Sequence, residues 1–392
     1  MSTHPTSSEH QALHDSATRF LAGLADFARQ RQRQQTGDWR LDRALWHQFG
    51  HLGWLGVMMP EAYGGLGLPA GDALTIMQAM GAHFVPEPYA ASLAAAQLLQ
   101  DLGSTAQQAR WLPRVCTGTA LLLPAHAEPG AGYALACVQT HAQSVGDGFR
   151  LEGRKSALPW GPNADGWLVS ARSAGAVGDA VGISLFVLER GTPGLRWEQP
   201  ATGIAGEPVA DLILEGVQVP ADALLGELGR AWAALEAAHE LLLAAACAEA
   251  VGTLQAVLDA SCEYARTRRQ FGVALSSFQV IAHRLVDMFT QVQLAHSMAD
   301  LAAATLAQAG PQRHLRLAAC KAQISAACRF VGEQAVQIHG GIGMTDELAL
   351  SHQVRRLLAI DRRLGDRFHH LGVLAASVQG GAGLYGVQEL AA

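Results

Sequence analysis

The chain changes twice between helical and strand-like patterning, and this order constrains its fold more than any other feature. From His10 to about Thr119, apolar residues recur three, four or seven positions apart, the spacing of one helical face. Near Leu121 the pattern changes to short apolar runs bounded by glycine, proline, aspartate and asparagine, which is typical of strands. Helical patterning returns from Ala231 to about Ala376. We therefore predict an α+β protein.

This order predicts three domains. We expect an N-terminal helical domain over residues 1–120, a small β-barrel or sandwich over 121–225, and a C-terminal helical domain over 226–392 that ends in a loose tail at 380–383. The expected strands of the central domain are Gly148–Leu151, Gly166–Ser170 and Ile183–Leu188.

Composition narrows the class of protein. Apolar residues make up 49% and charged residues 16% of 392, which indicates extensive burial. The net charge of −6 gives no electrostatic footprint for nucleic acid.

The stretch Leu241–Leu258 is of borderline length for a membrane span, but its alanine content and the central Glu249 favour a helix buried in protein. The six cysteines form no CxxC pair, and the N-terminus has no basic or apolar signal region, so we expect a cytoplasmic protein with reduced thiols.

One glycine-rich run carries the clearest chemical signal. Gln337 begins the sequence Gln-Ile-His-Gly-Gly-Ile-Gly, in which Gly340, Gly341 and Gly343 would let backbone N–H groups approach a pyrophosphate. No Walker A sequence and no strand–GxGxxG–helix context are present, so an ATP or nicotinamide site has little support. HExxH is absent too, and we expect no metal site.

This run resembles the flavin-binding signature of the acyl-CoA dehydrogenases. The resemblance extends over roughly residues 40–375 and includes Leu52–Gly56 with Pro60–Gly67, the Glu128–Gly132 loop, and Arg268–Gly272 followed by Phe278-Gln279. It implies the family fold, with a C-terminal four-helix bundle, and an FAD-dependent enzyme that forms the α,β double bond of an acyl-CoA. An electron-transferring flavoprotein is the implied electron acceptor.

The resemblance also assigns cofactor contacts. It implies that Arg268, Phe271 and Gln279 bind the ADP part of FAD together with Gln337, Gly340 and Gly341. A planar guanidinium suits phosphate oxygens, and the Phe271 ring can cover an adenine or ring face. In the family these two groups belong to different subunits, which implies a homo-oligomer or a heteromer with a related dehydrogenase subunit. The chain most resembles the branch of the pimeloyl-CoA dehydrogenase small subunit.

The usual catalytic glutamate is missing. An ungapped count from Gly341 puts its position on Leu364, and the alternative position of some family members falls on Leu242. Leucine cannot accept the α proton. Glu249 lies seven residues after Leu242, hence on the same helical face, and a lone buried carboxylate should have a raised pKa.

Glu249 is therefore the candidate base, with ion pairing to a neighbouring Arg or Lys as the alternative. Asp366 is a weaker candidate, with a helix-cap or surface role as its alternative, and Glu240 is expected to be a solvated residue near a helix start. In the β-domain, Ala157–Pro159 replaces the family's segment that contacts the flavin ring, and Trp160 is expected either to stack on that ring or to lie in the core.

Two other functions remain open. The chain could be a non-catalytic or half-site subunit of a heteromeric dehydrogenase, because its glutamate is missing. Loss of the α-proton base is also compatible with a flavin oxidase or monooxygenase on the same fold.

Overall fold

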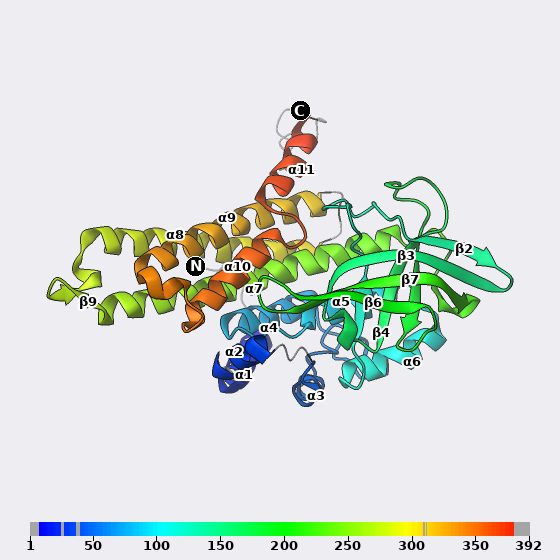
Figure 1. Cartoon of the computed structure of the whole chain (residues 1–392), viewed down its shortest axis with the longest axis horizontal. Coiled ribbons are helices and arrows are strands. Elements are labelled where there is room, and N and C mark those ends of the chain that lie inside the picture. The colour runs from blue at the N-terminus through cyan, green and yellow to red at the C-terminus, as the bar shows by residue number, and fades with distance from the viewer. Residues whose placement is uncertain (1–7, 25–26, 37–39, 309, 311, 380–392) are drawn as a thin grey trace. The chain divides into compact units, whose positions relative to one another are not determined.

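The computed structural model describes residues 8–24, 27–36, 40–308, 310 and 312–379 (Figure 1). The predicted loose tail at 380–383 lies outside these residues.

The chain forms two compact units. We call the unit made of Gly37–Pro69 and Glu87–Leu242 the β unit, and the unit made of Met1–Thr36, Ala70–Pro86 and Leu243–Ala392 the helical unit. The α+β class and the helix–strand–helix order are confirmed by the element order. The three domain boundaries stay a prediction.

The β unit contains one eight-stranded sheet in the order β6-β7-β3-β2-β4-β5-β8, with β1 parallel to β4. Each of the three expected strands lies within an observed one, and every residue of β4 is buried, as expected for a central strand. The strands are β1 (Leu122–Ala125), β2 (His141–Val145), β3 (Gly148–Pro159), β4 (Gly166–Arg172), β5 (Ile183–Glu189), β6 (Leu195–Thr202), β7 (Pro208–Pro220) and β8 (Leu224–Leu225).

Helices complete the β unit. Helix α6 begins with a capping box, in which the Ser104 hydroxyl accepts from the Gln107 N–H and the Gln107 side chain accepts from the Ser104 N–H. The helices are α3 (Arg43–His51), α5 (Tyr89–Leu102) and α6 (Thr105–Cys116), with short 3₁₀ turns η1 (Glu61–Tyr63), η2 (Gly161–Asn163) and η3 (Ala221–Ala223). Helix α7 (Trp232–Thr267) begins in this unit and continues into the helical unit.

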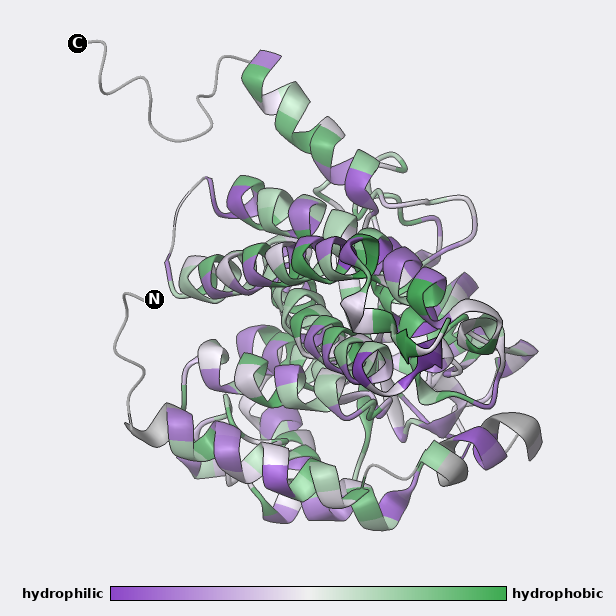
Figure 2. Cartoon of the chain, turned by 90° about the vertical axis from the view of Figure 1, so that its left-hand side faces the viewer, coloured by the Kyte–Doolittle hydropathy of each residue, from purple (hydrophilic) through white to green (hydrophobic). Residues whose placement is uncertain are grey.

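In the helical unit, three long helices and the shorter α10 share one core. Buried residues of α7, α8, α9 and α10 make up this core, among them Leu254, Val292, Ile324 and Leu357. Figure 2 shows hydrophobic and hydrophilic residues alternating along the helices, as expected where one face of a helix is buried. The unit contains α1 (Ser8–Leu24), α2 (Phe27–Thr36), α4 (Ala70–Ala82), α8 (Gln279–Leu306), α9 (Arg313–His339), α10 (Ala349–Arg362), α11 (Arg367–Gln379), η4 (Leu275–Ser277), η5 (Gly340–Met344) and the hairpin β9 (Arg269–Gln270) with β10 (Val273–Ala274).

Two glycines let α4 approach α7 closely. A Cβ added at Gly81 would lie 2.1 Å from the Glu249 carbonyl oxygen, and one added at Gly252 would lie 1.9 Å from the Gln78 carbonyl oxygen. The Thr253 hydroxyl bonds the carbonyl oxygens of both Gly81 and Glu249. Only glycine fits at these two contacts, so the backbone around Glu249 is fixed by helix packing.

Helix α7 is long and apolar enough to cross a membrane by length and composition, but 83% of its most apolar window is buried inside the structure. This burial agrees with the predicted core helix.

All six cysteines are free, and burial raises the pKa of the Cys247 thiol to about 12, so this thiol is unreactive.

Candidate functional site

The Glu128–Gly132 loop of the β unit is fixed by a buried ion pair. Lys155, on β3, has a side chain with 0% exposure, and its Nζ donates to Glu128 Oε1 over 2.5 Å. The carboxylate also accepts from the backbone N–H groups of Gln139 and Thr140, at 2.6 and 3.0 Å. Burial lowers the pKa of Lys155 to about 8, although Glu128 opposes this shift. The pair holds Glu128, the first residue of the loop, to β3.

His126 extends this buried network at the start of the loop. Its Nδ1 lies 2.9 Å from the Ser170 hydroxyl, its Nε2 lies 2.8 Å from the Leu135 carbonyl oxygen, and Lys155 also donates to Ser170. Burial and the charge of Lys155 lower the pKa of His126 to about 4. A neutral ring with Nε2–H donating to Leu135 satisfies both contacts, so His126 joins the segment before the loop to the segment after it.

A strained bulge in β3 lies beside the loop. The Ser156 N–H donates to the Ala127 carbonyl oxygen, and Ala157 has a φ of 49°, a left-handed conformation that is unusual for alanine. Asp211 on β7 accepts from the Ala157 N–H at 2.7 Å. Such strain persists only where the surroundings enforce it, and it is frequent at functional sites.

Trp160 follows the bulge and lies in the core. Its φ is 59°, and the residue is only 3% exposed. A ring that stacks on a cofactor should be accessible when no cofactor is bound, so the burial of Trp160 favours the core interpretation. Its stacking role stays a prediction.

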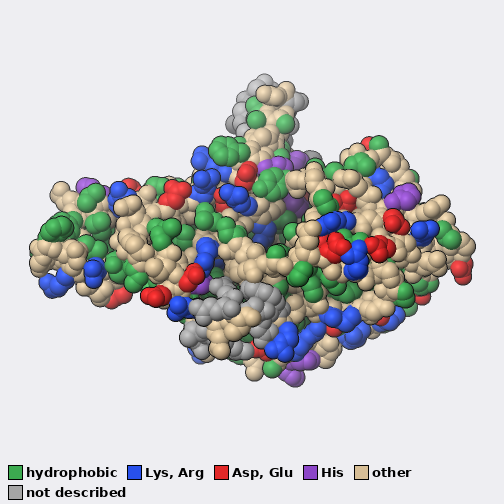
Figure 3. Space-filling model, in the orientation of Figure 1, with side chains coloured by type: hydrophobic (Ala, Val, Ile, Leu, Met, Phe, Trp, Pro, Cys, Tyr) green, Lys and Arg blue, Asp and Glu red, His purple; other side chains and the backbone are tan. Residues whose placement is uncertain are grey.

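The predicted ADP-binding residues lie in the helical unit and are accessible. Arg268 and Gln279 are exposed, and Phe271, at the turn between β9 and β10, has 93% exposure and a φ of 53°. A bulky residue with a left-handed backbone and an exposed ring is costly unless it contacts a ligand or partner. Figure 3 shows hydrophobic side chains on the surface at the end of the helical unit that carries β9. Val273 and Val280 are also exposed.

The glycine-rich run ends α9 close to the end of α7. The Tyr264 ring of α7 stacks on the His339 ring of α9, with centroids 4.2 Å apart. Tyr264 lies one helical turn before Arg268, and His339 lies directly before Gly340. Gly340 has a φ of 66°, and a Cβ added at Gly340 or Gly341 would have no heavy atom within 4 Å. The backbone there is open, as a pyrophosphate cradle requires, and Gln337 is exposed one turn earlier.

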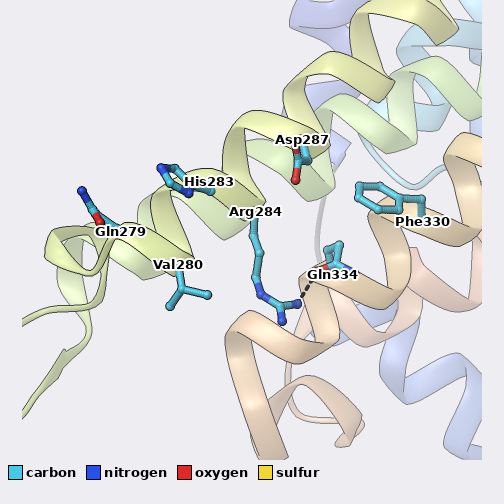
Figure 4. A pocket seen from close by; sticks show the side chains of 7 residues that line it. All are labelled: Gln279, Val280, His283, Arg284, Asp287, Phe330 and Gln334. Atoms are coloured by element: carbon cyan, nitrogen blue, oxygen red, sulfur yellow. Dashed lines mark hydrogen bonds between the residues drawn. The ribbon is translucent and has the colours of Figure 1, made fainter.

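A cleft of about 580 Å³ lies between α8 and α9 in the same unit (Figure 4). Gln279 is the predicted cofactor residue that lines it. Arg284 donates to the Gln334 side chain across the cleft, so a guanidinium and amides are available for phosphate or ribose oxygens. The other lining residues are Val280, His283, Asp287 and Phe330.

Glu249 is fully buried and paired with two arginines of the helical unit. Its carboxylate accepts from Arg356 Nε, on α10, and from Arg363 Nη1 at 2.8 Å. Burial alone would raise the pKa of Glu249, but Arg356 and Arg363 lower it below the usual value. The predicted raised pKa is therefore wrong, because the sequence did not reveal the arginines, and the ion-pair alternative is confirmed. A role as base stays a prediction.

The other carboxylates also have structural contacts. Asp366 Oδ1 accepts from the His369 N–H at 2.9 Å and so caps the start of α11, as the alternative for this residue predicted. Glu240 has only 7% exposure, so the expected solvated position is wrong. Leu364, at the usual position of the base, has a φ of 60° and is half-buried.

Sequence reasoning missed His126, Lys155 and Lys321. Lys321 on α9 is buried and donates to three oxygens. Its signal was a lone charge within the apolar run Leu317–Cys328, the same kind of signal that singled out Glu249.

Comparison with known proteins places this geometry in a family. Three models of the acyl-CoA dehydrogenase family match along the chain: the N-terminal domain at residues 7–119, the middle domain at 124–217 and the C-terminal domain at 232–378. The chain belongs to the acyl-CoA dehydrogenase family. It is 32% identical to "Probable acyl-CoA dehydrogenase YngJ" of Bacillus subtilis over 82% of this chain and 85% of the relative.

Two further members illustrate the family. The chain is 29% identical to the caffeyl-CoA reductase-Etf complex subunit CarC of Acetobacterium woodii, over 78% of this chain and 81% of that one. Its fold matches butyryl-CoA dehydrogenase from Megasphaera elsdenii with a TM-score of 0.87 at 26% identity, covering 97% of this chain and all of that one. The predicted family and fold are confirmed. The pimeloyl-CoA dehydrogenase branch stays a prediction.

Proposed function

We propose that the chain is an FAD-dependent acyl-CoA dehydrogenase that forms a double bond between the α and β carbons of an acyl-CoA thioester. The observation that carries this proposal is the match of all three family domains, in order, over nearly the whole chain. The half-site subunit and the oxidase are not favoured by these matches. The relatives include one named as a probable acyl-CoA dehydrogenase and one named as a subunit of a caffeyl-CoA reductase-Etf complex.

The accessible residues of the helical unit fit the ADP part of FAD. Arg268 would bind phosphate oxygens, Phe271 would cover the adenine, and the open backbone at Gly340 and Gly341 would receive the pyrophosphate. Gln337 and Gln279 would add uncharged hydrogen bonds. When bound, FAD supplies the hydride acceptor.

In the β unit, the buried pair of Lys155 and Glu128 holds the Glu128–Gly132 loop in one conformation. The bond from Ser156 to Ala127 joins this loop to the β3 bulge. We infer that loop and bulge together orient the thioester and the flavin ring. A loop fixed by fully satisfied buried groups needs little reorganisation when substrate binds.

Removal of the α proton needs an acceptor in a dry site. Glu249 remains the proposed base and Asp366 the weaker candidate. For Glu249 to act, one arginine would have to release a carboxylate oxygen, since Arg356 and Arg363 each hold one. The contacts therefore also support a positioning role for Glu249. If Glu249→Gln leaves the rate of flavin reduction unchanged, Glu249 is not the base.

We infer an oligomeric, cytoplasmic enzyme that passes electrons to an electron-transferring flavoprotein. The CarC relative, named as part of an Etf complex, supports the acceptor. Exposed apolar residues on the β9–β10 hairpin and on α8 support a subunit interface, either between copies of this chain or with a related dehydrogenase subunit. They are Phe271, Val273, Val280, Val286 and Phe289.

The test is flavin occupancy followed by anaerobic reduction. The purified protein should contain FAD, and its visible absorbance should bleach with at least one acyl-CoA from a panel of straight, branched and cyclic chains. A protein that binds acyl-CoA but holds no flavin, or whose flavin is reduced by none of the panel, would contradict the proposal.

A further inference from the structure

His352 is a buried histidine that joins three elements of the helical unit. It lies on α10 and has only 3% exposure. The ring of Phe27, the first residue of α2, meets the His352 ring edge-on, with centroids 5.0 Å apart. Phe84, which follows α4, meets it edge-on as well, at 6.3 Å. His352 thus links the start of α2 to α10 and to the end of α4.

Two hydrogen bonds fix the protonation state of this ring. Its Nδ1 lies 2.9 Å from Arg355 Nη2, and its Nε2 lies 3.2 Å from the Asp346 carbonyl oxygen. A guanidinium can only donate and a carbonyl oxygen can only accept. Nδ1 must therefore accept and Nε2 must donate, which requires the neutral ring. A second proton, on Nδ1, would point at an N–H group of Arg355 and break that bond.

The surroundings of the ring also favour its neutral form. Burial lowers the pKa of His352; the hydrogen bond to the Asp346 carbonyl oxygen opposes this shift, and the charges of Arg355 on α10 and Arg31 on α2 add to it. The Asp346 carboxylate has the opposite effect, but it lies 4.0 Å from Nε2, is 63% exposed and pairs with Arg355 at 2.8 Å. A proton on the ring would therefore be placed between two arginines.

Helix α2 has little else to hold it in place. Its sequence contains two apolar residues, Phe27 and Ala28, and is otherwise made of arginine, glutamine and a final threonine. Buried apolar area is the main source of stability in helix packing, and in α2 the Phe27 side chain supplies most of it. The attachment of α2 should therefore respond to a change of charge on the ring that Phe27 contacts.

We propose that His352 is an acid-sensitive latch, a ring that keeps α2 in place while it is neutral and releases α2 when it is protonated. Once α2 leaves, the ring loses its contact with Phe27 and the charge of Arg31 and gains access to water. It then titrates as an ordinary histidine, with a pKa of about 6.5. The released state thus binds a proton more readily than the docked state, and acid favours release.

The pH window follows from this difference. Docking of α2 is fully stabilised above the ordinary pKa of about 6.5, weakens as pH falls below it, and levels off below the lowered pKa of the docked state. Between pH 7.5 and 5.5, the fraction of molecules with α2 released should rise by up to about tenfold, because the lower value is one unit below 6.5.

Hydrogen exchange of the full-length protein as purified measures this release. Mass spectrometry at pH 7.5 and 5.5, with each rate divided by the intrinsic rate at that pH, gives the protection of peptides covering Phe27–Thr36. Their protection should fall by up to about tenfold at pH 5.5, whereas peptides of α8 in the same sample should change by less than twofold.

His352→Gln is the deciding variant. Glutamine offers one acceptor and one donor but cannot titrate, so we expect protection of α2 to be the same at both pH values. The matched control is His296→Gln on α8, because His296 is half-buried and burial also lowers its pKa. It should show the wild-type response of α2.

Two results would overturn the latch. Protection of α2 in the wild-type protein that stays within twofold between pH 7.5 and 5.5 would show that acid does not release the helix. An acid response of α2 in His352→Gln equal to that of the wild type would assign the response to another group. If the glutamine variant does not fold, His352→Phe decides the same question, because it keeps an aromatic ring beside Phe27 and cannot titrate.

Discussion

Replacing Glu249 by glutamine tests the ion pair that joins α7 to α10. The carboxylate has 2% exposure and Arg356 has 8%, so the variant leaves a guanidinium buried without its counter-charge. Removing one partner of a buried pair costs about 3–5 kcal/mol. Arg363 is 33% exposed, and its bond adds at most about 1 kcal/mol. We expect Glu249→Gln to lower the free energy of unfolding by about 3–5 kcal/mol, a large part of the stability of a typical domain.

Urea unfolding at pH 7 with excess FAD, followed by circular dichroism, measures this loss. The matched control on α7 is Glu263→Gln, because Glu263 pairs with Arg266 at 3.9 Å on the surface and its loss should cost under about 0.5 kcal/mol. A loss below about 1 kcal/mol for Glu249→Gln, at an unchanged m value, would refute the reasoning.

The loss of stability in Glu249→Gln should depend on pH, because only the ionised form of Glu249 pairs with the arginines. Arg356 and Arg363 lower the pKa of Glu249 in the folded state against the opposing effect of burial, so its ionised form stabilises the fold above the unfolded pKa of about 4.3. That contribution is lost as pH falls through the folded pKa. The difference between wild type and Glu249→Gln should therefore be constant from pH 6 to 8 and should shrink below about pH 4. A difference that grows on acidification would contradict the lowered pKa.

Three further predictions concern other parts of the chain. Gly81→Ala should lower the free energy of unfolding by about 1–3 kcal/mol, because its Cβ would meet a backbone oxygen, whereas Gly71→Ala on the same helix, with open space, should be neutral or stabilising in the same urea assay. Glu128→Gln leaves Lys155 buried without a carboxylate, so we expect a loss of about 3–5 kcal/mol in urea unfolding at pH 7; a loss under about 1 kcal/mol would contradict the buried pair. Phe271→Ala should weaken FAD binding about tenfold in a fluorescence titration without lowering the melting temperature of the apoprotein, because the ring is 93% exposed; unchanged affinity would remove Phe271 from the site.

Periodicity and turn residues predicted the element order well, because these signals are local. The run Ile183–Leu188 lies within β5, and the apolar stretch that includes Glu249 forms part of the buried helix α7. The bulge in β3 was not predictable. It depends on Asp211 of β7, which is 54 residues away and accepts from the Ala157 N–H.

At the candidate site, too, the contacts between residues far apart in the sequence could not be predicted. The residue pattern of Gln337–Gly341 identified accessible glycines, because glycine has no side chain to cover its backbone. The pKa of Glu249 depends on Arg356 and Arg363, which lie 107 and 114 residues further along the chain, and sequence spacing cannot pair them. A lone charge in an apolar run thus indicates a buried polar contact, but it does not distinguish a base from an ion pair.

Anaerobic mixing of the FAD-loaded protein with acyl-CoA tests the central claim most directly. We predict that the visible absorbance of oxidised flavin disappears with at least one acyl-CoA, that the enoyl-CoA product forms in equal amount, and that an electron-transferring flavoprotein restores the absorbance. A flavin that stays oxidised with every acyl-CoA that binds would contradict the assignment as an acyl-CoA dehydrogenase.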